Sequence, residues 1–233
     1  RTARLLEINK MRTAMIKQFI INKVGTDYVV GDIHGCFSLL QAKLDEIGFD
    51  PTKDRLFSVG DLVDRGTESD KVLEWLSKHW FHAVCGNHEQ MIIDAFNGGD
   101  NEIHQCAVNG GTWFFSQSPQ EQQNIVKAFS RLPILIEVTT ADGLVGIVHA
   151  EVEANNWIAT KQTLTTPGEF NDHTLERCIW GRTKIQRKDE TVVSGVDKVY
   201  CGHTPGYEVV VLGNQYYIDT WAVKTGNITV MKI

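Results

Sequence analysis

The sequence lacks several features that would place it in a specialised class of protein. Its five cysteines are odd in number and form no CxxC pair, which argues against a disulfide framework or a zinc knuckle. We therefore expect reduced cysteines in a cytoplasmic protein. No apolar run approaches the roughly 20 residues that span a bilayer. The sequence also has no internal repeat, no low-complexity tract and no Pro/Gly-rich linker, and it has only five prolines.

A large excess of basic charge is absent as well. The 233 residues include 23 basic and 29 acidic side chains, for a net charge of −6, which argues against a nucleic-acid partner. Apolar residues make up 42% and charged residues 22%, an ordinary globular composition. We expect one domain over residues 26–233, preceded by an N-terminal extension over residues 1–25. Met11 and Met15 are candidate translation starts, and with either one the basic stretch over about the first 13 residues would be a tail.

The first half of the chain alternates between strand and helix patterns. Short apolar runs predict strands at 28–30, 56–59 and 83–85. Apolar residues at helical spacing predict helices over 37–47, from about 69 to 76, and over 89–96. A β-α-β-α-β order of this kind favours parallel strands.

The second half is richer in strand patterns. Asp142-Gly143 predicts the turn of a hairpin between the first two strands of this half. The polar stretch 150–182 is expected to be a long irregular loop that forms a lid or wall. The predicted strands are 134–139, 144–149, 198–201, 208–212, 215–218 and 228–233.

Metal-capable side chains follow directly after predicted strands, usually beside a glycine. Three segments carry most of them: Gly31-Asp-Ile-His-Gly35, Gly60-Asp-Leu-Val-Asp-Arg-Gly66 and Gly86-Asn-His-Glu89. Two further histidines, His149 and His203, follow later strands. Ligands bind at the carboxyl ends of strands in open α/β sheets, so these side chains are expected to meet there.

The residue types at these positions suit divalent metal ions. Asp32 and His34 are two residues apart, so on an extended backbone they point to the same side. Carboxylate, imidazole and amide groups together suit manganese, iron or zinc. Two such ions close together can share one carboxylate and activate water for attack on a phosphate. The pattern therefore indicates a dinuclear metal site.

In their order along the chain, these motifs resemble the calcineurin-like metallophosphoesterase superfamily. Within it, residues 26–233 resemble the compact serine/threonine protein phosphatases of the phage-lambda type and their bacterial relatives. Segments 86–91, 109–115, 179–182 and 217–220 are similar to that subfamily. The resemblance implies a four-layer α/β/β/α sandwich with two mixed β-sheets and a dinuclear metal site at the strand ends.

The same resemblance implies a metal-dependent phosphomonoesterase that acts on phosphoserine and phosphothreonine of proteins, with phosphotyrosine as a further candidate. Asp61 would bridge two metal ions, by family analogy manganese, with iron or zinc as alternatives. Phosphorus would be attacked directly by a metal-bridging hydroxide, without a phosphoenzyme. The implied metal ligands are Asp32, His34, Asp61, Asn87, His149 and His203.

Four further residues acquire roles through the resemblance. His88 is similar to the family's general acid, which protonates the leaving oxygen, and Asp64 resembles the residue that orients it. Arg65 and Arg182 would bind the phosphate oxygens, a task suited to a planar guanidinium. A phosphoprotein is the expected partner, and no nucleic acid, membrane or obligatory regulatory subunit is implied.

Two segments depart from the subfamily's pattern. The usual Ala-Asp-Tyr-Pro after His149 reads Ala150-Glu-Val-Glu153, and the usual Asp-Thr-Gly-Ala reads Asp219-Thr-Trp-Ala222. A glycine at the third position of the latter segment would permit a positive φ, whereas an indole is expected not to. We therefore expect Trp221 to line the groove or to require a local rearrangement.

Three alternative functions remain open at this stage, and one of them, a nuclease of the same superfamily, is disfavoured by the acidic net charge. A symmetrical dinucleoside-tetraphosphate hydrolase uses very similar motifs but cleaves an anhydride and must hold two nucleosides. A phosphopeptide-binding module without catalysis is the alternative from a different class of protein. Such a module should lack a ligand or the general acid, and none of the implied residues is missing here.

Overall fold

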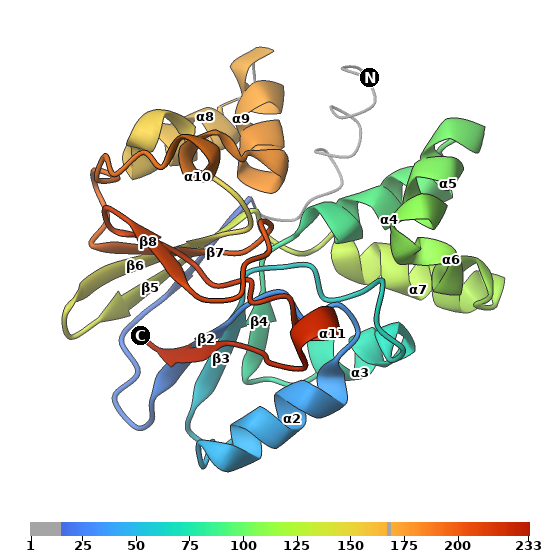
Figure 1. Cartoon of the computed structure of the whole chain (residues 1–233), viewed down its shortest axis with the longest axis horizontal. Coiled ribbons are helices and arrows are strands. Elements are labelled where there is room, and N and C mark those ends of the chain that lie inside the picture. Colours follow the sequence, from blue (N-terminus) through green and yellow to red (C-terminus); the bar gives the residue numbers. More distant parts are fainter. Residues whose placement is uncertain (1–14, 167–168) are drawn as a thin grey trace.

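A computed structural model describes residues 15–166 and 169–233 and contains two mixed β-sheets (Figure 1). The four-stranded sheet has the order β10-β2-β3-β4. Its strands β2 (Asp27–Val30), β3 (Arg55–Ser58) and β4 (Phe81–Ala83) are parallel, and β10 (Val230–Lys232) is antiparallel to β2. The predicted parallel β-α-β-α-β unit is therefore confirmed.

Strand β4 ends two residues earlier than predicted. Val84 N still donates to Ser58 O of β3, but Cys85 N donates to Pro133 O, outside this sheet. The chain therefore leaves the ladder before the apolar run ends.

The six-stranded sheet has the order β1-β5-β6-β7-β9-β8. Strands β5 and β6 pair as an antiparallel hairpin, which confirms the predicted turn at 142–143. Strand β1 lies within the expected N-terminal extension and pairs in parallel with β5, while residues 1–14 lie outside the described part of the chain. The strands are β1 (Ile16–Phe19), β5 (Leu135–Thr140), β6 (Gly143–Val148), β7 (Lys198–Cys201), β8 (Val210–Leu212) and β9 (Gln215–Tyr217).

The two sheets pack against each other through their inner faces. Side chains alternate between the two faces of a strand, so Val30 and Leu56 point outward and pack with Phe37 of α2 in a second apolar cluster. The inner layer consists of apolar side chains from both sheets, among them Val29, Phe57, Ile136, Val138, Val145, Ile147 and Tyr200.

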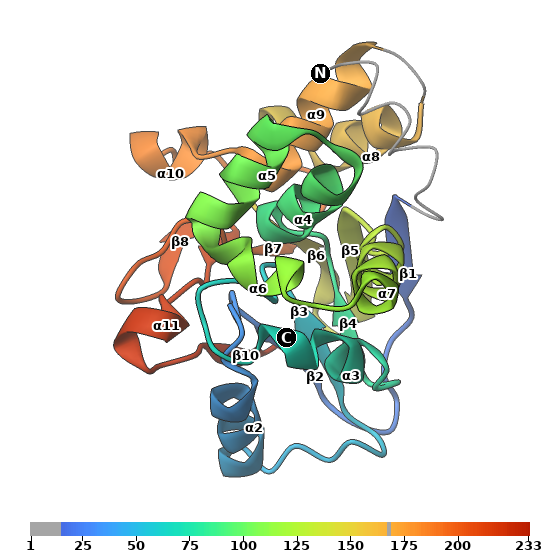
Figure 2. The same cartoon turned by 90° about the vertical axis from the view of Figure 1, so that its right-hand side faces the viewer.

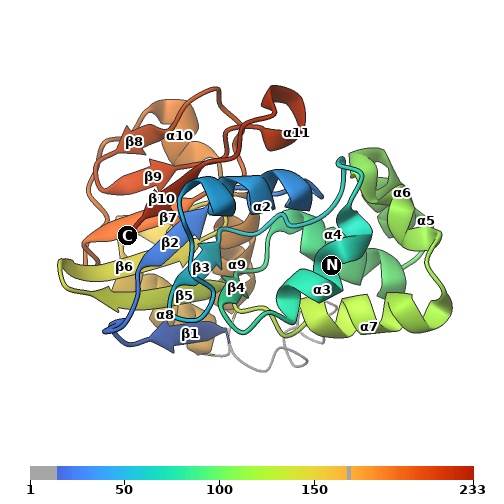
Figure 3. The ribbon, with the colours of Figure 1, turned by 90° about the horizontal axis from the view of Figure 1, so that it is seen from below.

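Helices cover the outer faces of both sheets. Helix α2 lies below the four-stranded sheet, α4 to α7 form a group beside it, and α8 to α10 lie beyond the six-stranded sheet (Figures 1, 2 and 3). The predicted four-layer α/β/β/α sandwich is therefore confirmed. The helices are α2 (Phe37–Glu46), α3 (Val72–Leu76), α4 (Asn87–Asn97), α5 (Asp100–Cys106), α6 (Thr112–Phe115), α7 (Pro119–Phe129), α8 (Trp157–Thr165), α9 (Glu169–Trp180), α10 (Thr183–Arg187) and α11 (Ala222–Thr225), with short 3₁₀ or π turns η1 (Ser69–Lys71), η2 (Ala107–Gly111) and η3 (Glu153–Asn155).

The prediction of an irregular loop over 150–182 was wrong. This stretch contains α8 and α9, although its composition is polar. Asn156 begins α8 by accepting a hydrogen bond from Ala159 N, and Trp157 is fully buried against Gly146 of β6. One buried indole and a capping side chain thus fix a helix that hydrophobic periodicity does not reveal.

None of the helices in the described ranges is long and apolar enough to cross a membrane.

Candidate metal centre

The implied metal ligands converge at the carboxyl ends of the strands, where all six are buried. Asp32 and His34 follow β2, Asp61 follows β3, and Asn87 begins α4 after β4. The six-stranded sheet contributes His149 and His203, which follow β6 and β7. Residues far apart in the sequence therefore share one site because both sheets end at the same edge.

Direct contacts join the two halves of this site. Asn87 Oδ1 lies 2.8 Å from His149 Nε2 and 2.8 Å from His203 Nδ1. The backbone nitrogen of His203 donates to Asp32 Oδ2 at 3.0 Å, so β2 and β7 are linked across the sheets.

Much of the site is built on backbone with positive φ. His34 has φ 44°, Asp61 φ 51° and His203 φ 68°, a conformation that non-glycine residues adopt infrequently. Hydrogen bonds hold these turns, since Asp61 O accepts from the backbone nitrogens of Ile33 and His34. Gly60 also has φ 98°, and a Cβ there would lie 2.7 Å from Gly86 N, so only glycine fits between the two loops. Strain of this kind gathers at functional sites.

The tautomers of two histidines direct lone pairs into the site. His34 Nδ1 lies 2.9 Å from Val63 O, and His149 Nδ1 lies 2.7 Å from Val59 O. A carbonyl can only accept, so Nδ1 carries the hydrogen and Nε2 of the neutral ring is an acceptor. His149 Nε2 then faces another acceptor, Asn87 Oδ1. A cation between the two atoms would remove this conflict, so the donor set fits a metal ion.

The described His, Asp, Glu and Cys side chains include two groups able to hold a metal ion, and the groups share Asp61. One is His34, Asp61 and His88; the other is Asp61, His149 and His203. The ligand atoms within each group lie within 4.8 Å of one another. The shared carboxylate has the arrangement that a bridging ligand requires. Asp32, an expected ligand of the first ion, is in neither group and accepts a hydrogen bond from His203 N, while His88 is the third member of the first group.

Burial and mutual repulsion dominate the electrostatics of the site. Burial, and then Asp219 and Asp61, hold the pKa of Asp32 well above its usual range. Burial lowers the pKa values of His34 and His203 to about 3, so both imidazoles are neutral at pH 7. Several acids therefore lie together without protonated imidazoles at these two positions. Divalent cations would offset this buried negative charge.

His88 and Asp64 form a hydrogen-bonded pair beside the metal-capable groups. His88 Nδ1 lies 2.6 Å from Asp64 Oδ2, and both side chains are almost completely buried. The Arg65 guanidinium spans the site, with Nη1 2.8 Å from His34 Nε2 and Nη2 3.0 Å from His88 Nε2. A fixed cation that can donate two hydrogen bonds is thus present between the two imidazoles.

Arg182 contacts the site through His203. Its Nε donates to His203 Nε2 at 3.0 Å and its Nη2 to His203 O at 3.2 Å. The Trp180 ring meets the His203 ring edge-on, with centroids 5.9 Å apart. The structure therefore brings every residue predicted for the site to one place.

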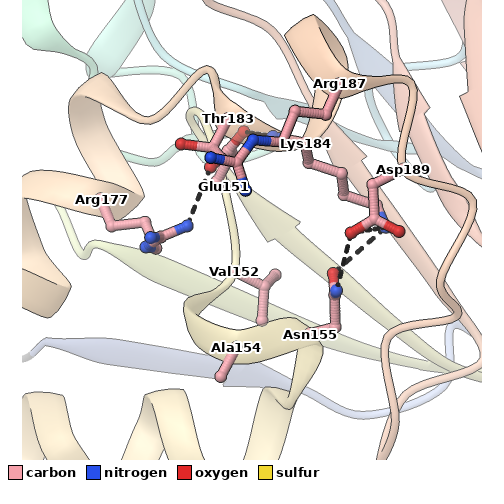
Figure 4. Close-up of a pocket in the computed structure, with 9 residues that line it drawn as sticks. All are labelled: Glu151, Val152, Ala154, Asn155, Arg177, Thr183, Lys184, Arg187 and Asp189. Carbon is pink, nitrogen blue, oxygen red and sulfur yellow. Dashed lines mark hydrogen bonds and ion pairs between the residues drawn. The ribbon is translucent and has the colours of Figure 1, made fainter.

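Glu151 stands where the subfamily usually has aspartate, and its longer side chain connects two segments of the site. Its carboxylate accepts from Lys184 N at 2.5 Å and from Arg177 Nη1 at 3.2 Å, beside a cavity of about 80 Å³ (Figure 4). Glu151 follows His149 by two residues, and Lys184 follows Arg182 by two. Its side chain therefore ties the segment that carries His149 to the segment that carries Arg182.

The expectation that an indole excludes a positive φ was wrong for Trp221. This residue has φ 57° and begins α11. Its backbone N–H donates to Asp219 Oδ1, and its backbone carbonyl accepts from the backbone nitrogens of Lys224 and Thr225. Its ring lies 6.2 Å from that of Tyr207, and Lys224 Nζ lies 3.9 Å from its centroid. These contacts hold a conformation that glycine would adopt without cost.

Three residues near the site received no role from the sequence. Asp219 is buried, and burial is the main cause that raises its pKa. Glu89 accepts from three backbone nitrogens around Asp61, and Trp113 donates to Asp64. All three lie in segments that resemble the subfamily's motifs, and this resemblance is the sequence feature that could have identified them.

Comparison with known proteins agrees with this geometry. The family model described as Calcineurin-like phosphoesterase matches residues 28–230, and the chain belongs to this family. Serine/threonine-protein phosphatase 1 of Salmonella typhimurium is 37% identical over 209 residues, covering 88% of this chain and 91% of that protein. Serine/threonine-protein phosphatase 2 of Escherichia coli is 34% identical, covering 88% and 92%.

Other matches are partial or concern the fold alone. A symmetrical bis(5'-nucleosyl)-tetraphosphatase of Photorhabdus laumondii is 45% identical, but over 73 residues, 30% of this chain and 26% of that protein. The crystal structure of a putative diadenosine tetraphosphatase aligns with TM-score 0.61 at 20% identity, covering 94% of this chain and 98% of that one. A serine/threonine phosphatase structure from Saccharomyces cerevisiae aligns with TM-score 0.56 at 18% identity, covering 92% and 74%.

The family and the two His/Asp groups together support divalent metal ions as the cofactors.

Proposed function

We propose that this protein is a metal-dependent serine/threonine protein phosphatase that hydrolyses phosphomonoesters. The observation that carries the proposal is the His88–Asp64 pair beside two metal-capable groups that share Asp61. A proton donor beside a cationic centre is what the departure of a poor alkoxide leaving group requires. The serine/threonine phosphatases that match over 91 to 92% of their own length support this substrate class.

We propose that the metal ions are held by the residues that resemble the family's ligands. Asp32 and His34 would hold the first ion, and Asp61 would be shared. The second ion would be held by Asn87, His149 and His203. The ions would supply positive charge for the phosphate and favour ionisation of water at neutral pH. The mixed carboxylate, imidazole and amide set supports manganese, with iron or zinc as alternatives.

Arg65 and Arg182 would bind the phosphate oxygens from two sides. Both guanidinium groups already donate into the site, to His34, His88 and His203. In the complex, the same N–H groups would turn to the phosphate, since charge-assisted bonds to an anion are stronger than bonds to a neutral imidazole. This arrangement would fix the phosphate for in-line attack.

His88 would then supply the proton for the leaving oxygen. Asp64 accepts the Nδ1 hydrogen and leaves Nε2 facing the site, where Arg65 now contacts it. Water would attack phosphorus as the ester oxygen departs and takes the Nε2 proton of His88 in its imidazolium form, and the proton that the attacking water releases would restore that form. The products are the free hydroxyl side chain and inorganic phosphate, and no phosphoenzyme forms.

Release of inorganic phosphate from a phosphothreonine peptide tests this function. The protein is stripped with a chelator and assayed before and after addition of manganese, iron or zinc. We expect activity only with added metal, and highest with manganese. Absence of phosphate release with every metal, despite bound metal, would contradict the proposal and favour a phosphopeptide-binding module.

A second candidate is a symmetrical dinucleoside-tetraphosphate hydrolase. The local identity of 45% over 73 residues favours it as the alternative. Diadenosine tetraphosphate is therefore assayed beside the peptide under the same conditions. Faster cleavage of the nucleotide than of the peptide would move the assignment to this alternative.

We also propose that the protein works in the cytoplasm. All five cysteines are free thiols and four of them are buried, which fits a reducing compartment. Isolation under thiol-blocking conditions followed by mass spectrometry would detect a disulfide, and a disulfide would contradict this location.

A further inference from the structure

Trp113 contacts the oxygen of Asp64 that His88 leaves free. The indole Nε1 donates to Asp64 Oδ1 at 2.7 Å, while His88 Nδ1 lies 2.6 Å from Asp64 Oδ2. Asp64 is completely buried, and its backbone N–H donates to Ser69 Oγ at 2.9 Å. The carboxylate is therefore held at both oxygens by side chains from different elements.

We propose that Trp113 is a positioning residue for His88 and acts through Asp64. This inference rests on the proposed function, in which His88 is the general acid. A carboxylate rotates readily about its last side-chain torsion, which has no sharp minima. An indole N–H can only donate, so it fixes Oδ1 and thereby the direction of Oδ2. His88 Nε2 is then held toward the leaving oxygen.

The backbone of Asp64 and Arg65 also depends on contacts with the segment that carries Trp113. Asp64 has φ 73° and Arg65 φ 68°, and each such conformation costs about 1 to 2 kcal/mol for a residue with a Cβ. Gly110, three residues before Trp113, has φ 105° and packs on Arg65. A Cβ at Gly110 would lie 2.8 Å from Arg65 N. The turn η2 therefore lies directly against the strained pair.

These contacts account for Gly110 and Trp113 in the segment 109–115. The glycine lets the turn approach Arg65, and α6 then directs the indole of Trp113 to Asp64. Simple packing does not account for this position of the ring, because Trp113 is only partly buried, whereas its neighbour Phe114 is fully buried.

The dependence of the rate on the leaving group separates positioning from packing. General acid catalysis matters for phenyl phosphate and phosphothreonine, and much less for 4-nitrophenyl phosphate, whose leaving group needs little protonation. We expect Trp113→Phe to lower kcat roughly tenfold for phenyl phosphate, the effect of losing one hydrogen bond. For 4-nitrophenyl phosphate we expect about twofold or less, with KM and metal content unchanged.

Two comparison variants calibrate this result. His88→Asn removes the general acid itself, so it gives the largest expected difference between the loss of kcat for phenyl phosphate and that for 4-nitrophenyl phosphate. Trp75→Phe removes the same atoms from another buried indole, which stacks on Phe37 in the core, and it should affect both substrates equally. If Trp113→Phe does not fold, benzothienylalanine at position 113 removes only the N–H and keeps the ring. Equal losses for both substrates, or no loss, would overturn the proposal.

A spectroscopic measurement tests the contact without any catalysis. In metal-free protein with ¹⁵N-labelled tryptophan, the Trp113 indole N–H is identified by its loss in Trp113→Phe. We expect its resonance to move and its solvent exchange to quicken in Asp64→Ala. An unchanged resonance would show that the two side chains do not interact. If the wild-type protein fails to hydrolyse phosphothreonine peptides, the proposed function fails. The rates with the two aryl phosphates and the indole N–H resonance still test whether Trp113 positions His88 through Asp64.

Discussion

Replacement of Glu89 by glutamine tests how the loop that carries Asp61 is held. Glu89 is completely buried, and its carboxylate accepts three backbone hydrogen bonds. Oε2 accepts from Asp61 N at 2.9 Å and Gly86 N at 2.8 Å, and Oε1 accepts from Leu62 N at 2.8 Å. The same side chain thus caps the N-terminus of α4 and stabilises the positive φ of Asp61.

The expected loss follows from these contacts. Burial, and then Asp61, raise the pKa of Glu89 to about 7, so at pH 8 the side chain is largely a carboxylate. Glutamine replaces one oxygen by an amino group, which can only donate, and at least one buried N–H then faces another donor. An unsatisfied buried group costs about 1 to 3 kcal/mol. We therefore expect the free energy of unfolding to fall by about 2 to 3 kcal/mol.

Urea denaturation of the metal-free protein at pH 8, followed by tryptophan fluorescence, measures this loss. The matched control is Glu121→Gln, because Glu121 also caps the N-terminus of its helix, α7, but is exposed. The control should lose less than about 1 kcal/mol. Equal losses in both variants, or none in Glu89→Gln, would refute the reasoning. Reduced metal affinity in Glu89→Gln alone would connect the loss to Asp61.

Three other changes follow from the structure. Asp61→Asn should lower metal content by elemental analysis, because both metal-capable groups use this carboxylate; full occupancy would contradict the bridging role. Arg182→Ala should raise KM for aryl phosphates severalfold, and unchanged kinetics would make Arg182 a surface arginine. Burial, and then Lys17 and Arg55, lower the pKa of His82 to about 3, so between about pH 6.5 and 3 only the unfolded chain takes up a proton at this residue. The free energy of unfolding therefore decreases as the pH is lowered, by up to about 1.4 kcal/mol per pH unit for this group. His82→Phe should remove this contribution, which urea denaturation of the variant and the wild type at pH 7 and pH 5 measures. Equal losses of stability in the two proteins would refute the reasoning.

The sequence alone determined most of the architecture and the position of the site. Apolar runs followed by glycine predicted β2 and β3, and the residues after them are the ones that meet in the structure. This succeeds because a strand's period and end are local properties, and because parallel strands place their carboxyl ends at one edge of a sheet.

Other features depended on contacts that no local pattern contains. Helix α8 forms because Trp157 packs on a strand, and Trp221 adopts a positive φ because Asp219 and two later N–H groups hold its backbone. Trp113 and Asp64 are 49 residues apart. Propensity and periodicity describe a segment by itself, so they miss an element whose stability comes from its neighbours.

What the sequence by itself determined, therefore, is which chemical groups are available and at which edge of the fold they lie. The tertiary structure decided how they are oriented. Val59 O fixes the tautomer of His149, and Trp113 and Ser69 fix Asp64 beneath His88. The physical reason is that hydrogen bonds are directional and short, so the orientation of a side chain is set by partners that only folding brings within reach.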